Sequence, residues 1–171
     1  MYKIRIILDT KEDVIRTILV DESISLESLH TTIAKSFGFE GQEMASFYRT
    51  DDDWNQGEEI PLFNMAEAGE EISMQTCFVD EILAEENSKL IYVYDFLNMW
   101  TFYVDVVEIS SEIKENLPET ILSFGKMPET APKKEFVAEN LNDDFGDEDI
   151  NDLDDLDENY GQFDDYDFNE Y

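Results

Sequence analysis

Few side chains in this sequence belong to the types that bind metals, form disulfides or relay protons. The 171 residues include one cysteine, Cys77, and one histidine, His30. A disulfide needs two cysteines, and a Cys/His zinc site or a two-imidazole relay needs several such side chains, so the composition excludes all three. The motifs GxGxxG, Walker A, GxSxG and HExxH are absent as well. We therefore predict no metal and no cofactor, and no motif indicates a particular reaction.

Basic residues are also scarce. Lys and Arg number 11 against 43 Asp and Glu, which gives a formal net charge of -32. Binding to nucleic-acid phosphates or to an anionic membrane requires clustered basic residues, so direct binding of either is disfavoured. Hydrophobic residues still make up 42% of the sequence and aromatic residues 13%, which is enough for a folded core.

No segment has the features of a membrane span or of a secretory signal. No apolar run approaches the roughly 18 residues that cross a bilayer. The segment Met1–Leu8 is short and is interrupted by Lys3 and Arg5. We therefore expect a cytoplasmic protein in which Cys77 stays reduced and acts as an inert core thiol.

Nearly half of the charge is concentrated at the end of the sequence. Residues 139–171 contain 15 acidic and no basic residues, so they carry -15, whereas residues 1–138 carry -17. Blocks of acidic residues repel one another, and the apolar residues here follow no regular period for long, so we predict a disordered acidic tail. A solubilising, repulsive tail is one interpretation, and a partner-binding tail is the other. In the second, the candidate contacts are the aromatic residues Phe145, Tyr160, Phe163, Tyr166, Phe168 and Tyr171.

Two acidic segments approach the spacing of a calcium-binding EF-hand loop without completing it. The segment that starts at Asp147 has Glu158 in the twelfth position, but Asp152 occupies the sixth position, where the loop needs glycine. In the segment that starts at Asp51, the glycine Gly57 comes one position late. We interpret both as chance matches and expect the second to be an exposed acidic turn.

Residues 125–138 are expected to link a folded domain to the acidic tail. Gly125, Pro128 and Pro132 disfavour a regular helix or strand over 125–135. The segment also contains three of the few basic residues, which neutralise nearby acids: Lys126, Lys133 and Lys134. The predicted organisation is a domain over 1–124, a Pro/Lys linker over 125–138 and a tail over 139–171.

The hydrophobic pattern of residues 1–124 predicts a sheet with one main helix. The helix begins after Ser25, a suitable N-cap, and ends at Gly38, with Leu26, Leu29, Ile33 and Phe37 on one face. A short helix is favoured within 76–83. The predicted strands are Lys3–Leu8, Val14–Val20, Met44–Arg49, Glu59–Phe63, Leu90–Tyr94, Thr101–Ile109 and Thr120–Phe124.

A hairpin, a helix and then further strands indicate an α+β domain. We predict a β-grasp-like mixed sheet with the helix on one face. Pro61 cannot donate a ladder hydrogen bond, so it confines its strand to an edge of the sheet.

Several of these segments, taken in order, resemble a known family. They are Ile15–Val20, Leu26–Ile33, Phe37–Phe39, Ala45–Tyr48, Leu90–Phe96 and Trp100. Together they resemble the plasmid pRiA4b ORF-three-like family, some members of which are labelled passenger TnpR proteins of an insertion element. The resemblance covers about residues 2–125 and leaves the tail outside. It implies an α+β domain without an established activity.

The sequence departs from the family pattern at three places. Ile15 stands where the family commonly has Trp, and Glu43–Ala45 stands where it commonly has a histidine. Residues Leu97–Phe102 stand where the family commonly has Gly-Asp-x-Trp followed by a histidine. If those histidines form a site in relatives, the resemblance implies that this chain lacks that site.

His30, Asp95 and Trp100 are the candidate residues for a pocket. His30 shares the helix face of the apolar residues, so we expect a packed, hydrogen-bonded imidazole, with a functional role as the alternative. Asp95 is its one candidate companion by the family pattern, although a turn residue that bonds its own backbone is the simpler interpretation. Trp54 and Trp100 are expected to be packing or interface anchors.

Three functional hypotheses follow from this sequence. The first is a non-enzymatic interaction module whose acidic tail engages or repels a basic protein surface. The second is a small-ligand-binding or enzymatic domain with a pocket near His30 and Asp95. The third is an acidic DNA mimic that occupies a nucleic-acid-binding protein.

Overall fold

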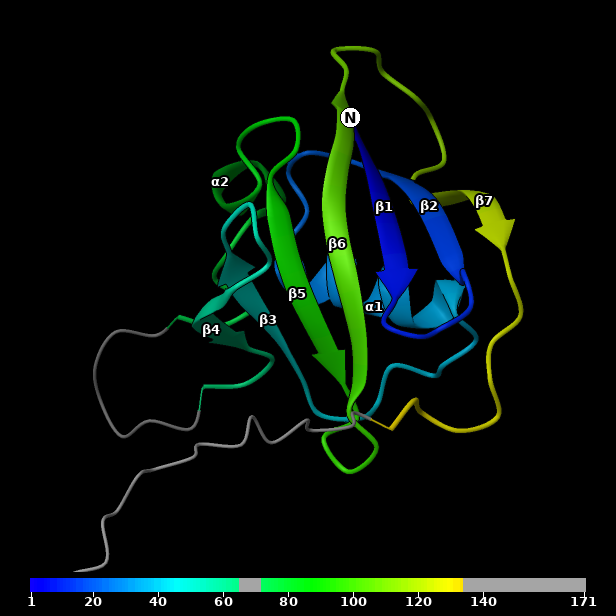
Figure 1. The fold of residues 1–171 in the computed structure, drawn as a ribbon. Coiled ribbons are helices and arrows are strands. Elements are labelled where there is room, and N and C mark those ends of the chain that lie inside the picture. Colours follow the sequence, from blue (N-terminus) through cyan, green and yellow to red (C-terminus); the bar gives the residue numbers. More distant parts are fainter. Residues whose placement is uncertain (65–71, 134–171) are drawn as a thin grey trace, which may run out of the picture. The chain divides into compact units, whose positions relative to one another are not determined.

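The protein forms a seven-stranded sheet with one main helix packed on one face. The computed structural model describes residues 1–64 and 72–133. In chain order the elements are β1 (Tyr2–Leu8), β2 (Ile15–Val20), α1 (Leu26–Ser36), β3 (Ala45–Thr50), β4 (Gln56–Pro61), α2 (Val79–Ile82), β5 (Lys89–Tyr94), β6 (Trp100–Ile109) and β7 (Glu119–Phe124). Figure 1 shows α1 behind the sheet, with β4 and β7 at its two edges.

The strand order is β4-β3-β5-β6-β1-β2-β7, and each of the six pairings is antiparallel. The prediction of an α+β fold with a helix on one face is therefore confirmed. The prediction of a mixed sheet is wrong for the described strands, because strand direction depends on distant pairings that local patterns do not encode. The arrangement does not confirm a β-grasp relation.

The core lies between the sheet and α1. Alternate residues of β1 point to this side, and their burial follows the strand period of two, with Ile4 and Ile6 completely buried. Ile4 lies opposite Ile18 of β2 and Val106 of β6 in the two flanking pairings. These apolar cross-strand neighbours fix the register, since a slip by one residue would turn them away from the helix.

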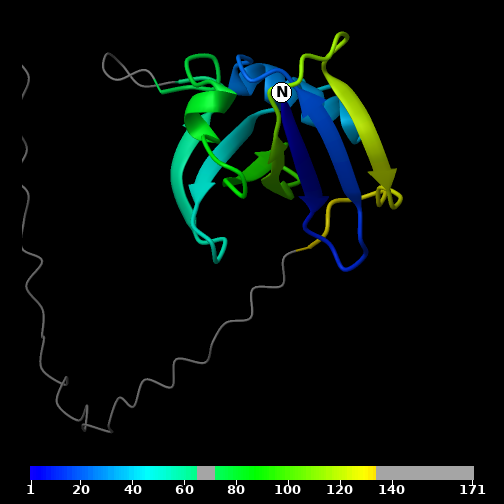
Figure 2. The same cartoon turned by 90° about the horizontal axis from the view of Figure 1, so that it is seen from above.

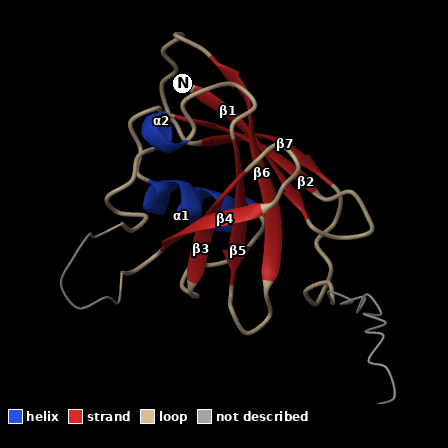
Figure 3. Cartoon of the chain, turned by 60° about the vertical axis from the view of Figure 1, so that its left-hand side comes forward, coloured by secondary structure: helices blue, strands red, loops and turns tan. Residues whose placement is uncertain are grey.

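Helix α1 has the start and end that its sequence predicts. The Ser25 hydroxyl accepts a hydrogen bond from the Ser28 N–H at 3.2 Å, and Glu27 lies in the first turn, where the helix dipole favours an acid. Gly38 follows the helix with φ of +89°. The buried residues of the helix are Leu26, Leu29, His30, Ile33 and Ala34. Figure 3 shows α1 and the much shorter α2 against the same sheet.

Arg16 ties the end of α1 to β2 and β7. Its buried guanidinium donates to the Ser36 carbonyl at 3.0 Å and to the Ile15 and Phe124 carbonyls, each at 2.8 Å. The guanidinium carbon also lies 4.9 Å from the centre of the Phe37 ring. Burial lowers the pKa of Arg16.

The edge position of the strand with Pro61 and the location of the short helix agree with the sequence, although this strand spans Gln56–Pro61 and not the predicted Glu59–Phe63. β4, which contains Pro61, is at one edge, and α2 lies within the predicted segment 76–83. β7 is at the other edge, and Figure 2 shows it at the far side of the sheet from β4.

Residues 125–133, the described part of the segment after β7, are irregular, as predicted, and Met127 and Ala131 pack against the core. The predicted acidic tail, with its six candidate aromatic residues, lies outside the described residues, so its disorder stays a prediction.

No helix in the described ranges is long and apolar enough to span a bilayer.

We expect Gly125→Ala to destabilise the domain more than Gly38→Ala. Both glycines have a positive φ, which costs an alanine about 1–2 kcal/mol. A Cβ on Gly38 would meet nothing within 4 Å, whereas a Cβ on Gly125 would lie 2.0 Å from the Asp13 carbonyl oxygen. Urea unfolding of both variants measures the difference, and equal losses would contradict the close approach of the chain at Gly125.

Candidate functional site

His30 is buried in the core and hydrogen-bonded on both ring nitrogens. Nε2 lies 3.3 Å from the Gly41 carbonyl oxygen, and Nδ1 lies 2.7 Å from the Tyr92 hydroxyl. A carbonyl can only accept, so Nε2 carries the hydrogen and Nδ1 accepts from Tyr92. Burial lowers the pKa of His30, which favours this neutral form. The packed histidine expected from the sequence is therefore confirmed.

Asp95 acts as a turn residue in the connection between β5 and β6. Its φ is +57°, and its carboxylate accepts hydrogen bonds from the backbone N–H groups of Leu97, at 3.2 Å, and Asn98, at 3.3 Å. The Asn98 side-chain amide donates to the same carboxylate at 2.6 Å. This geometry is typical of an Asx turn, as the sequence predicts.

Trp100 belongs to an aromatic cluster that extends to His30. Its ring centre lies 5.2 Å from that of Phe39, which lies 4.9 Å from that of Tyr94. Tyr94 in turn lies 6.0 Å from the imidazole of His30. The structure thus brings His30 and Trp100 into one cluster as core packing, while the hydrogen bonds of the Asp95 carboxylate remain within its own turn.

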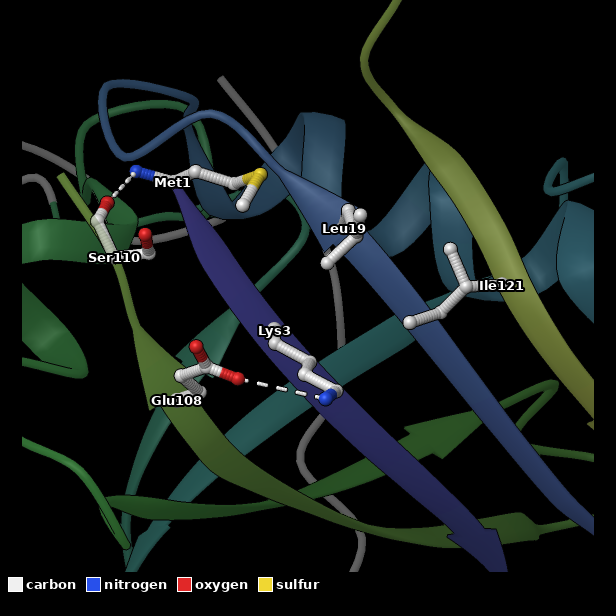
Figure 4. Close-up of a pocket in the computed structure, with 6 residues that line it drawn as sticks. All are labelled: Met1, Lys3, Leu19, Glu108, Ser110 and Ile121. Carbon is white, nitrogen blue, oxygen red and sulfur yellow. Dashed lines mark hydrogen bonds and ion pairs between the residues drawn. The ribbon is translucent and has the colours of Figure 1, made fainter. Parts of the chain in front are cut away.

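Two cavities that are lined by described residues contain none of the three candidate pocket residues. One of about 180 Å³ is lined by Met1, Lys3, Leu19, Glu108, Ser110 and Ile121, and Figure 4 shows these side chains around it. The other, of about 400 Å³, lies between α1 and the start of β7 and is lined by Ser28, Thr31, Thr32, Lys35, Ser36, Pro118 and Thr120.

The face of the sheet that points away from α1 is the more distinctive surface, and we call it the open face. It carries the alternate residues of the central strands, such as Arg5 of β1, Ile91 of β5 and Asp105 of β6. Ile91 and Asp105 are each only 7% exposed although α1 lies on the other side. Both side chains are therefore shielded on this side of the sheet as well.

Polar side chains on the open face connect neighbouring strands at two places, between β1 and β6 and between β3 and β4. Arg5 and Asp105 form a two-pronged ion pair, with Nε–Oδ1 at 3.0 Å and Nη2–Oδ2 at 2.7 Å. This hydrogen bonding raises the pKa of Arg5. Across β3 and β4, the Ser46 and Tyr48 hydroxyls both donate to the Glu59 carboxylate, at 2.6 Å and 3.2 Å.

An aromatic group adjoins these polar pairs. Trp54 contacts Tyr103 of the open face edge-on, with 4.9 Å between ring centres, and the Lys89 ammonium lies 5.1 Å from the centre of the indole. The Asp51 carboxylate accepts hydrogen bonds from Asp53 and Asn55, so the acidic turn expected there is confirmed. The described part of the chain holds no cluster of three or more potential metal ligands.

Sequence reasoning missed the open face as a surface. The period-two alternation of β1 already separated Lys3 and Arg5 from the apolar residues, and this was the available signal. The partners could not be found in the same way, because Arg5 and Asp105 are 100 positions apart.

We expect the His30 imidazole to titrate below its ordinary pKa of about 6.5. His30 is the only histidine, so its Cε1–Hε1 NMR signal is unambiguous during a pH titration. Below pH of about 6.5 the unfolded chain binds a proton that the folded chain resists, so the free energy of unfolding falls as the pH drops toward the folded-state midpoint.

Tyr92→Phe should move that midpoint upward, because it removes the donor to the unprotonated Nδ1. Tyr94→Phe is the matched control, since the Tyr94 hydroxyl accepts from the Glu43 N–H at 3.4 Å instead. A midpoint at or above the ordinary value in the unmodified protein would contradict the assigned tautomer and its burial.

Comparisons with known proteins identify a fold and a family but no activity. The fold is similar to the crystal structure of a protein of unknown function from Methanosarcina mazei Go1, with a TM-score of 0.56 and 16% sequence identity. The similarity covers 71% of this chain and 68% of that one, and at this identity it shows the fold alone. No curated protein matches the sequence.

The family model described as plasmid pRiA4b ORF-3-like protein matches residues 1–170. The match confirms the resemblance seen in the sequence and corrects its extent, because it continues beyond residue 125 and through most of the acidic tail. The chain belongs to the plasmid pRiA4b ORF-3-like protein family.

Proposed function

We propose that this chain is a non-enzymatic module that binds a basic surface of another protein. The observation that carries the proposal is the open face, where aromatic and charged side chains are held in fixed positions on a sheet surface that α1 leaves uncovered. Such a surface suits a protein partner, since interfaces are enriched in Tyr, Trp and Arg.

The net charge supports a basic partner. A charge of -32 attracts basic surfaces over long range and accelerates their encounter. Residues 139–171 contribute -15 of it together with the six aromatic residues, which would dock after the first encounter. We place this interaction in the cytoplasm.

The alternative of a pocket at His30, Asp95 and Trp100 has less support. The ring nitrogens of His30 are engaged by Tyr92 and Gly41, and the Asp95 carboxylate is engaged by its own turn. The third hypothesis, acidic DNA mimicry, predicts that DNA competes with this chain for the same partner, and a competition experiment separates it from the first.

Affinity capture from the lysate of its source, with three forms of the protein, tests the proposal. The forms are the full chain, residues 1–138, and a full chain with every candidate aromatic residue of the tail replaced by serine. The last form keeps the charge, so it separates electrostatic attraction from aromatic docking. Its substitutions are Phe145→Ser, Tyr160→Ser, Phe163→Ser, Tyr166→Ser, Phe168→Ser and Tyr171→Ser.

We expect the full chain to capture basic proteins that high salt releases, because salt screens charge attraction. Residues 1–138 should capture little of the same proteins, and the serine variant should retain them more weakly than the full chain. Capture that salt leaves unchanged would contradict the proposal, whereas equal capture by residues 1–138 would assign the contact to the domain with its open face and exclude a role for the tail.

A further inference from the structure

Among the described residues, strand β7 presents an unpaired edge. It is the last strand in the sheet order and, within residues 1–64 and 72–133, pairs only with β2. All six of its residues are exposed, and Figure 1 shows it in yellow at the side of the sheet. Arg16 donates a hydrogen bond to the Phe124 carbonyl at 2.8 Å, so the end of the strand is held in place. An unpaired strand edge is a template for another strand.

The other edge of the sheet is less suited to pairing. β4 contains Pro61, which has no N–H to donate, and Glu58 and Glu59, whose side chains bond to the neighbouring β3. β7 has neither proline nor lysine within its span, and Ile121 and Phe124 are strand-favouring residues. The two edges therefore differ in the features that usually block strand addition.

Exposed apolar side chains gather around β7. Ile121 is 42% exposed, Leu122 47% and Phe124 56%. Ile113, in the connection from β6 to β7, is exposed as well. Exposed apolar side chains of this kind are available for contact with a partner.

We propose that β7 accepts an extended basic segment of another protein as an additional strand of the sheet. This inference rests on the proposed function and specifies where the basic partner binds, namely at the β7 edge of the sheet. Residues 107–124 contain four acidic residues and one lysine, so the segment that ends in β7 carries a net negative charge. Backbone pairing would provide affinity, and alternate side chains of the partner would lie beside Leu122 or Phe124.

Charge distinguishes this occupant from a second copy of the chain. Pairing β7 with β7 of another copy would bring two molecules of -32 together, and the repulsion would oppose association. A basic segment brings the opposite charge to the same edge.

The test uses the full chain and a synthetic peptide of about six residues, the usual length of a strand, in which lysine and valine alternate. Hydrogen exchange measured by NMR reports on each β7 amide, with and without the peptide. We expect about tenfold slower exchange at the amides of residues 120–124 that face away from β2. Two control peptides replace lysine by glutamate, or valine by proline at unchanged charge, and neither should slow exchange.

A pair of proline variants locates the contact. Successive N–H groups of a strand point to opposite edges, so one of Leu122→Pro and Ser123→Pro removes a hydrogen bond to β2 and the other removes an outward N–H. The variant that keeps the unfolding midpoint of the unmodified chain should bind the lysine–valine peptide about tenfold more weakly. Unchanged affinity in that variant would overturn the assignment to β7.

The outcomes separate this inference from the proposed function. Salt-sensitive binding of the lysine–valine peptide without slower exchange in β7 would overturn the β7 site and leave the proposed function standing. Equal binding of the lysine and glutamate peptides would contradict the basic partner itself. A dimer of the free chain that the stable proline variant cannot form would show that a second copy occupies the edge, and would overturn the inference.

Discussion

The pairing of β1 with β6 is the constraint on which the rest of the structure depends. β1 lies between β6 and β2, and it pairs with β6 over its whole length from Tyr2 to Leu8. The two strands come from opposite ends of the domain sequence, so closing this pairing orders the chain between them. Because Ile4 faces Val106 on the α1 side, the same register also places Arg5 beside Asp105 on the other side. The apolar core and the charged pair of the open face are therefore two consequences of one alignment.

The open face contains a partly buried ion pair, and this limits which substitutions the face tolerates. Asp105 is 7% exposed, and its partner Arg5 has a side chain that is 47% exposed. An ion pair so placed stabilises modestly, but loss of Arg5 would leave a shielded carboxylate without its partner, which costs more than the pair contributes. The face thus remains fixed in shape, and a preformed surface needs little ordering when a partner binds.

The sequence predicts the elements of this fold well because their signals are local. The period-two pattern of β1, the Ser25 cap of α1 and the proline of β4 each act within a few residues, and each has the predicted role. The mixed sheet was wrong because the direction of neighbouring strands follows from pairings such as β1 with β6. The environment of His30 could be anticipated from its helix face, but its hydrogen bond to Tyr92, which is 62 positions away, could not.

Most of the few basic residues of the domain are already paired within it, so they do not neutralise the excess of acidic residues. Lys3, Arg5, Arg49, Lys89 and Lys114 each pair with a carboxylate, and the buried Arg16 is held by carbonyl oxygens. The described residues contain too few basic side chains to pair with the remaining acidic ones, so the electrostatic potential around the domain is negative.

In the proposed interaction, a basic partner would supply positive charge and so relieve repulsion among the acidic residues of the chain. The charge of -32 does not determine the fold, since the core depends on apolar alternation and on the packing of α1. It determines which surfaces can approach the open face and the edge of β7. Apolar side chains at that edge would then hold a partner that charge has selected.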